Sequence, residues 1–143
     1  MKSPRLLAFI AFALVVLSTA VALALSAAKR RAESLGCASI IPDICLDARV
    51  WAEDRGGMFP TNFVCMSNEL TTPKVLVCPA DHSRRRAEDW SSFTPTNSSY
   101  EIVSPGMRAD ETNRVFLRCT VHGHLGYGDT TVFDGVRRRH KFE

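Results

Sequence analysis

An uncharged apolar run at Leu6–Ala28 constrains this chain more than any other feature of its sequence. The run spans 23 residues, and Ser18, Thr19 and Ser26 are its only polar members. A helix of this length, rising about 1.5 Å per residue, matches the roughly 30 Å hydrocarbon core of a bilayer. We therefore predict a retained membrane anchor. A cleaved signal peptide is the alternative, because small residues end the run, although the apolar core of a signal usually holds only about 7–15 residues.

The rest of the 143-residue chain is long enough for one small domain with a single core. When Lys2 and Arg5 are set aside from the 18 basic residues, 16 remain against 15 acidic ones. Such a balance does not favour nucleic acid as a partner. The sequence contains no phosphate loop, no G-x-S-x-G and no H-E-x-x-H motif, so we expect no enzyme and no cofactor.

A second helical pattern follows the apolar run directly. Apolar residues recur at steps of three and four along residues 29–55, which places them on one face of a helix. This predicted core face comprises Cys37, Ile41, Ile44, Ala48 and Trp51. The opposite, polar face carries Arg31, Asp43, Asp47, Arg49 and Asp54. We predict one helix that continues from the anchor and ends at Gly56-Gly57, with a kink or break near residues 38–42 caused by Pro42. Two helices joined by a short loop are the alternative.

Short β-forming runs closed by turn residues predict the strands of the domain. The runs are residues 74–78, 99–103, 115–119 and 130–133. Helical turns are predicted at residues 66–70 and between Ser83 and Trp90. The predicted fold is α+β, with a long N-terminal helix, membrane-spanning in its first half, packed on a small antiparallel sheet of three or four strands. The predicted domains are an anchor at residues 1–28, a continuing helix at 29–55, a β domain at 56–136 and a basic tail at 137–143.

Four segments of the chain carry a resemblance to a known family. They read WAEDRGGMFP at residues 51–60, TPKVLVCPAD at 72–81, NSSYE at 97–101 and CTVHG at 119–123. With the anchor helix before them, they resemble the type IV pilin and type II secretion pseudopilin superfamily, and more specifically a bacterial group of pseudopilin-like proteins. The resemblance implies a pilin-like fold and other envelope or pilin-like proteins as partners.

The start of the anchor departs from that family. Prepilins carry a Gly followed by Phe-Thr-Leu-Ile-Glu, where a dedicated peptidase cuts. Residues 4–10 here read PRLLAFI, with neither the Gly nor the Glu. Processing by that route is therefore not expected from the sequence.

Two cysteines at predicted strand ends form the first candidate site. A disulfide between Cys78 and Cys119 is the pairing that we favour outside the cytoplasm, where it would close a loop of about 40 residues and stabilise the fold by roughly 4 kcal/mol. The spacings Cys78-x₃-His82 and Cys119-x₂-His122 also offer two sulfurs and two nitrogens, which is a ligand set for tetrahedral Zn²⁺. Unpaired thiols are the third possibility.

The other three cysteines give weaker signals. Cys37 and Cys45 lie eight residues apart on the predicted helix, roughly 12 Å along its axis, so they cannot bond each other. We interpret both as small packing residues. Cys65 has no evident partner.

Two other sets of charged residues are candidate binding sites. Asp129 and Asp134 could supply oxygen ligands to Ca²⁺, which major pseudopilins bind in their C-terminal loops, although turn-forming aspartates explain the pattern equally simply. The basic runs at residues 84–86 and 137–141 are expected to be a solvated turn and tail.

The sequence thus predicts a membrane-anchored, pilin-like structural protein of the cell envelope, belonging to a type II secretion or pilus-like assembly. A membrane-anchored binding module with a Cys/His zinc site is the alternative. We expect a single-pass protein of the inner membrane that contacts lipid through residues 6–28. Positive charges at the two ends of the run are nearly equal, so the resemblance and the paired cysteines decide the orientation, with the C-terminal domain outside the cytoplasm.

Overall fold

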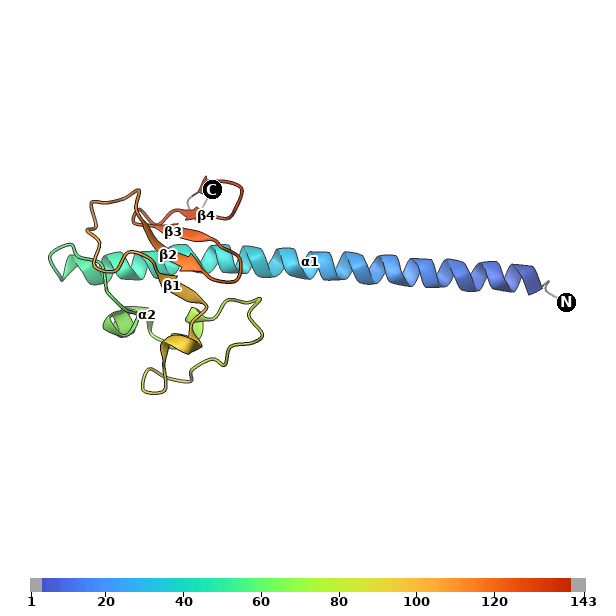
Figure 1. The fold of residues 1–143 in the computed structure, drawn as a ribbon, viewed down its shortest axis with the longest axis horizontal. Helices are drawn as coiled ribbons and strands as arrows, with labels where there is room; N and C mark the ends of the chain where they lie inside the picture. Colours follow the sequence, from blue (N-terminus) through green and yellow to red (C-terminus); the bar gives the residue numbers. More distant parts are fainter. Residues whose placement is uncertain (1–3, 140–143) are drawn as a thin grey trace. The chain divides into compact units, whose positions relative to one another are not determined.

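A computed structural model describes residues 4–139 of the chain. These residues fall into two compact units, the first ending at residue 32 and the second beginning at residue 33. One helix, α1 (Pro4–Glu53), begins in the first unit and ends in the second (Figure 1). The predicted continuation of the anchor into a second helical segment is therefore confirmed. The helix passes through Pro42 without interruption, so the predicted break at this residue is wrong. Ile41 and Ile44 on either side of the proline are buried, which holds the flanking turns in place.

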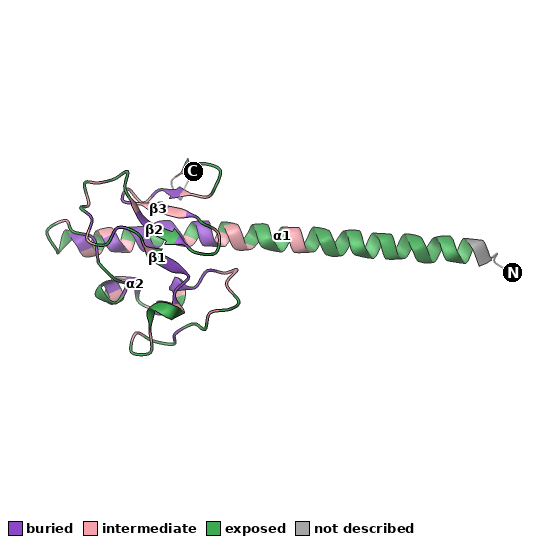
Figure 2. Cartoon of the chain, viewed as in Figure 1, coloured by how far each residue is buried: buried purple, intermediate pink, exposed green. Residues whose placement is uncertain are grey.

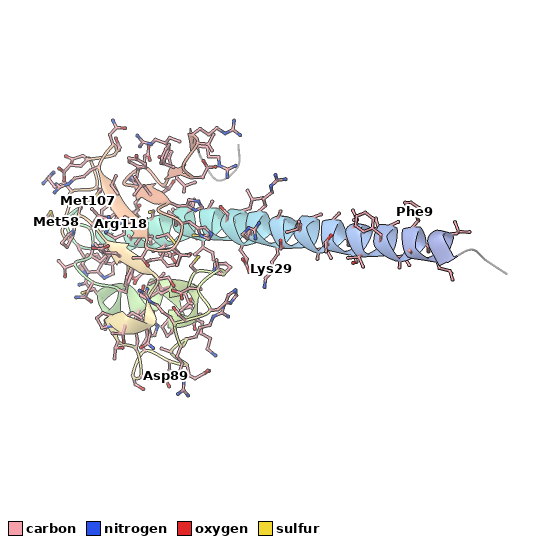
Figure 3. All side chains as sticks on the ribbon, turned by 45° about the vertical axis from the view of Figure 1, so that its right-hand side comes forward. Phe9, Lys29, Met58, Asp89, Met107 and Arg118 are labelled. Carbon is pink, nitrogen blue, oxygen red and sulfur yellow. The ribbon has the colours of Figure 1, made fainter. Side chains whose placement is uncertain are left out.

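In the first unit, α1 presents apolar side chains to its surroundings. Every residue from 6 to 25 is exposed, as the green stretch of the helix in Figure 2 shows. Phe9, labelled in Figure 3, is 73% exposed, and Leu23 is 70% exposed. Such a surface is unfavourable in water, whereas it suits the hydrocarbon of a membrane. By length and composition this helix could span a bilayer.

The second unit is a five-stranded antiparallel sheet with a helical layer. The strands β1 (Tyr100–Ile102), β2 (Val115–Cys119), β3 (Leu125–Tyr127), β4 (Val132–Phe133) and β5 (Arg138–Arg139) lie in chain order across the sheet. Residues 33–53 of α1 pack on this sheet (Figure 1). The predicted α+β class is thus confirmed, with five strands where three or four were expected.

The face of α1 toward the sheet is formed by small and medium apolar side chains. Cys37, Ile41, Ile44 and Ala48 are at most 1% exposed, whereas Trp51 is only half-buried. Gly126 in β3 lets the helix approach closely. A Cβ atom at this position would lie 2.5 Å from Ile41 Cγ2 and 2.6 Å from Cys45 Sγ, so any larger residue would push the layers apart.

Arg49 was assigned to the polar face, but its side chain is half-buried. Its guanidinium Nη1 donates hydrogen bonds to the carbonyl oxygens of Gly128, at 2.6 Å, and Ala109, at 3.2 Å. The long side chain reaches past the helix to these loops, which a helical-wheel pattern does not register.

Two local predictions are wrong: the strand at residues 74–78 and the helical turn between residues 83 and 90. Residues 73–76 form a 3₁₀ helix, η2 (Pro73–Leu76), in place of a strand. Pro73 occupies its first turn, and the Thr72 hydroxyl accepts a hydrogen bond from the Lys74 amide, so the local capping favours a helical turn. No helix forms between residues 83 and 90. The Asp81 carboxylate instead accepts hydrogen bonds from the backbone amides of residues 83 and 84, and these bonds fix a turn.

Other local predictions agree with the structure. Strands β1, β2 and β4 lie within the runs predicted at residues 99–103, 115–119 and 130–133. The helical turn predicted near residues 66–70 is α2 (Ser67–Leu70), which follows the 3₁₀ turn η1 (Val64–Met66). Another 3₁₀ turn is η3 (Pro95–Asn97).

The predicted end of α1 at two glycines also agrees with the structure. Gly56 and Gly57 have φ of +66° and +76°, and the Gly57 amide donates to the Ala52 carbonyl at 2.9 Å, as a helix C-cap requires. An isolated antiparallel bridge between Met58 and Arg108 follows this cap.

Strands β3 and β5 were not predicted. Strand β3 is centred on Gly126, which weakens the β-forming signal of its two neighbours. Strand β5 lies in the segment interpreted as a basic tail, and residues 140–143 of that tail lie outside the described residues.

Candidate metal centre

Three separate parts of the second unit meet at a cluster of sulfur and nitrogen atoms. Cys37 comes from α1, Cys78 follows η2, and Cys119 and His122 come from the end of β2 and the turn after it. The three Sγ atoms and one ring nitrogen all lie within 4.8 Å of one another. The cysteines are fully buried and the histidine is half-buried. The cluster therefore unites residues separated by more than eighty positions of sequence.

Cys37 reaches the cluster because the helix lies close to the turn that carries Cys78. A Cβ atom built on the neighbouring Gly36 would lie 3.5 Å from Cγ of Pro79, an ordinary van der Waals distance, so the helix and this turn lie side by side here. The Cys37 sulfur also accepts a hydrogen bond from the Tyr100 hydroxyl at 3.6 Å. Tyr100 is itself buried, which fixes the direction of that hydroxyl.

The turn after Cys78 is held by a short chain of hydrogen bonds. The Cys78 amide donates to Ser99 Oγ at 3.0 Å, and this hydroxyl donates to Asp81 Oδ2 at 2.7 Å. The Asp81 amide donates back to the Cys78 carbonyl at 2.9 Å. Burial opposes ionisation of Asp81, but hydrogen bonds from Ser83 and Ser99 outweigh it and lower the pKa of this carboxyl to about 2.

The turn after Cys119 directs backbone groups at the sulfur. The His122 amide lies 3.5 Å from Cys119 Sγ, and the Gly123 amide donates to the Cys119 carbonyl at 2.9 Å. Gly123 has φ of +72°, which an L side chain rarely adopts. The same turn places His122 Nδ1 3.3 Å from Cys78 Sγ.

The neighbouring thiols have different acidities. The interaction between the Cys37 and Cys119 side chains raises the pKa of Cys37 and lowers the pKa of Cys119. Burial raises the pKa of Cys37 further. Backbone amides of Val121 and His122 also lower the pKa of Cys119. Burial raises the pKa of Cys78. Cys119 is accordingly the thiol whose surroundings best support a negative sulfur.

A second histidine packs behind the cluster. The rings of His122 and His124 stack with centroids 5.0 Å apart. His124 is buried, its Nε2 lies 3.4 Å from the Ser34 hydroxyl, and its Nδ1 is buried without a described partner. Burial and then His122 lower the pKa of His124, so the ring is neutral at pH 7.

The sequence-based site is partly corrected by this geometry. All five cysteines lie in the described part of the chain and are free thiols, so the favoured Cys78–Cys119 disulfide is not formed. The two sulfurs do lie together, as the zinc alternative required, and His122 joins them. His82 does not, because the turn fixed by Asp81 leads the chain toward the surface. The His82 side chain is 70% exposed, and its Nε2 lies 3.5 Å from Glu33 Oε1.

Cys37 is the residue that sequence reasoning placed correctly but interpreted too narrowly. It is the first member of the predicted core face, and its burial explains that pattern without any chemistry. The only available signal was the presence of a cysteine at the end of the stripe nearest the anchor.

The other candidate ligands are paired with arginines. Asp129 Oδ2 lies 2.8 Å from Arg138 Nη2, and Asp134 Oδ2 lies 3.0 Å from Arg139 Nη2. The hydroxyl of Thr131 donates to Asp129 Oδ1. In this structure the two carboxylates thus compensate the charges of β5.

Comparisons with protein-family models, curated proteins and solved structures found no match to this chain. The structure itself defines an α+β domain with a Cys/His cluster. The helix that packs on its sheet is the later part of a long N-terminal helix whose first part is apolar.

Proposed function

We propose that this chain is a membrane-anchored, pilin-like structural protein of the cell envelope, working in a type II secretion or pilus-like assembly. One observation carries the proposal: α1 is apolar and exposed over residues 6–25, and buried against an antiparallel sheet over much of residues 37–52. A single helix thereby serves as lipid-facing segment and as domain core. The sequence segments that resemble pseudopilins support the same function.

The proposed location is the inner membrane, with the domain outside the cytoplasm. The free cysteines remove one of the two sequence arguments for this orientation. The resemblance remains as its support, because charges at the ends of the apolar run do not favour either direction. A reporter fused after Glu143 tests the orientation. We expect activity from a reporter that works only outside the cytoplasm, and activity of a cytoplasm-only reporter would contradict the proposal.

Assembly through helix packing makes a prediction about neighbouring anchors. In such an assembly, residues in the middle of the anchor lie beside the anchor of a second copy or of another pilin-like protein. We propose to introduce Val16→Cys into full-length protein that also carries Cys65→Ser, which removes the exposed native thiol. A membrane-permeant bis-maleimide applied to native membranes should then produce cross-linked species.

The matched control places the new thiol in the domain. Val136 is 86% exposed in the structure, so a Val136→Cys variant reports random collisions between domains. Cross-linking at position 16 well above that at position 136, with mass spectrometry identifying a second copy or a pilin-like partner, supports the proposed function. Equal, background cross-linking at both positions would contradict it.

A further inference from the structure

We propose that Cys37, Cys78, Cys119 and His122 bind one Zn²⁺ ion that joins α1 to the two turns flanking the sheet. This site differs from the one that spacing alone offered, because Cys37 replaces His82 as the fourth ligand. It does not depend on the proposed role in secretion or pilus assembly. A zinc ion here would be structural, since all four coordination positions are supplied by the protein.

The distances between donor atoms fit a tetrahedral zinc site. Zinc–sulfur bonds near 2.3 Å and zinc–nitrogen bonds near 2.0–2.1 Å give donor–donor distances of about 3.5–3.8 Å in a tetrahedron. His122 Nδ1 and Cys78 Sγ lie 3.3 Å apart, and no two of the four donors are more than 4.8 Å apart. Small rotations of the cysteine side chains, which move their sulfur atoms by about one ångström, close the site around an ion.

The donor types favour zinc over the hard divalent ions. Three thiolates and one imidazole form a soft ligand set, which suits zinc and excludes magnesium and calcium, since these ions prefer oxygen. Binding releases the three thiol protons to solvent and uses Nδ1 of His122 as the nitrogen ligand.

The surroundings of the donors are already arranged as a second coordination shell. The Tyr100 hydroxyl donates to Cys37 Sγ at 3.6 Å, and the His122 amide lies 3.5 Å from Cys119 Sγ. Hydrogen bonds of this kind orient metal ligands and stabilise thiolate charge. The amide of Cys78 is anchored by Ser99, so its turn is fixed from the backbone side.

The competing explanations account for less of the geometry. A Cys78–Cys119 disulfide would use two sulfurs and leave no role for the convergence of Cys37 and His122. Simple core packing accounts for buried thiols, as it does for Cys45 beside Gly126. It does not account for an imidazole nitrogen directed at a sulfur inside the same cluster.

The test is metal analysis of the full chain, purified in detergent under reducing conditions and loaded with Zn²⁺ alone. We expect one zinc per chain, four fewer thiols reactive under native conditions than after chelation and denaturation, since Cys45 is buried along with the three ligand cysteines, and a higher melting temperature with zinc than without. Replacement of zinc by Co²⁺ should give the intense d–d and thiolate charge-transfer bands of tetrahedral coordination. No bound zinc, or, in a parallel sample purified without reductant, a chain lighter by two hydrogen atoms through a Cys78–Cys119 disulfide, would overturn the proposal.

Variants assign the ligands and separate this site from the one expected from spacing. His122→Ala and Cys37→Ser should each lower zinc occupancy at least tenfold, and Co²⁺ spectra show whether residual binding keeps its geometry. The matched controls are His82→Ala and Cys65→Ser, which should retain one zinc. Loss of zinc in His82→Ala with retention in Cys37→Ser would refute the assignment of Cys37. If a ligand variant fails to fold, Tyr100→Phe remains informative, because loss of the hydrogen bond to Cys37 Sγ should weaken zinc affinity about tenfold while the fold persists.

Discussion

Asp47 shows at the scale of one residue how packing around α1 affects ionisation. Burial, together with the nearby charges of Asp43 and Glu69, raises the pKa of Asp47 to about 6. A carboxyl whose pKa is higher in the folded than in the unfolded state binds more protons when folded. Its contribution to the free energy of unfolding therefore decreases as the pH rises from about 4 to 6.

We predict that Asp47→Asn stabilises the protein at pH 7. The gain should be about 1–2 kcal/mol, once solvent screening of this half-buried group is allowed for, and should vanish near pH 4. Denaturant unfolding of both proteins from pH 4 to pH 7 measures the difference directly. Glu53→Gln, an exposed carboxyl near the end of α1, is the control and should change little. An Asn variant no more stable than the parent at pH 7 would contradict the burial of Asp47.

At the scale of elements, the contact between α1 and β3 depends on a missing side chain. Gly126→Ala would place a Cβ atom within 2.6 Å of Ile41 Cγ2 and Cys45 Sγ. We predict a loss of about 1–3 kcal/mol in the free energy of unfolding, since the packed layers must separate. Gly36→Ala is the matched control within α1. It meets only Pro79 at an ordinary 3.5 Å, so the higher helix propensity of alanine should stabilise by about 0.5–1 kcal/mol. Chemical denaturation of the two variants should show opposite signs, and equal effects would mean that the helix does not contact β3 as described.

The same contact explains which elements the sequence could predict. The core face of α1 follows from a local period, which is why the burial of Ile41 and Ile44 was foreseeable. The η2 segment was mistaken for a strand because its valine and leucine content outweighed the capping by Thr72. At the candidate site, spacing pointed to Cys78, Cys119 and His122. Spacing could not predict Cys37 as a ligand, because the packing of the helix against the two turns depends on tertiary structure and not on local sequence.

At the scale of the whole molecule, the apolar part of α1 should decide where the protein resides. A charge at the middle of a membrane-spanning helix costs about 2.5–3.5 kcal/mol. We predict that Leu17→Arg strongly reduces the fraction of full-length chain that stays in membranes after alkaline extraction. Leu46→Arg replaces an exposed leucine in the second unit and should leave that fraction unchanged. Equal retention of both variants would show that the apolar segment is not the anchor.

The central claim is that α1 is retained intact as an anchor while its later part forms the core of the domain. The most direct test is the intact mass of the parent chain recovered from membranes after alkaline extraction. We predict a membrane-embedded species that still contains residues 6–28. A soluble species that begins near Lys29, with the apolar segment removed, would contradict the claim.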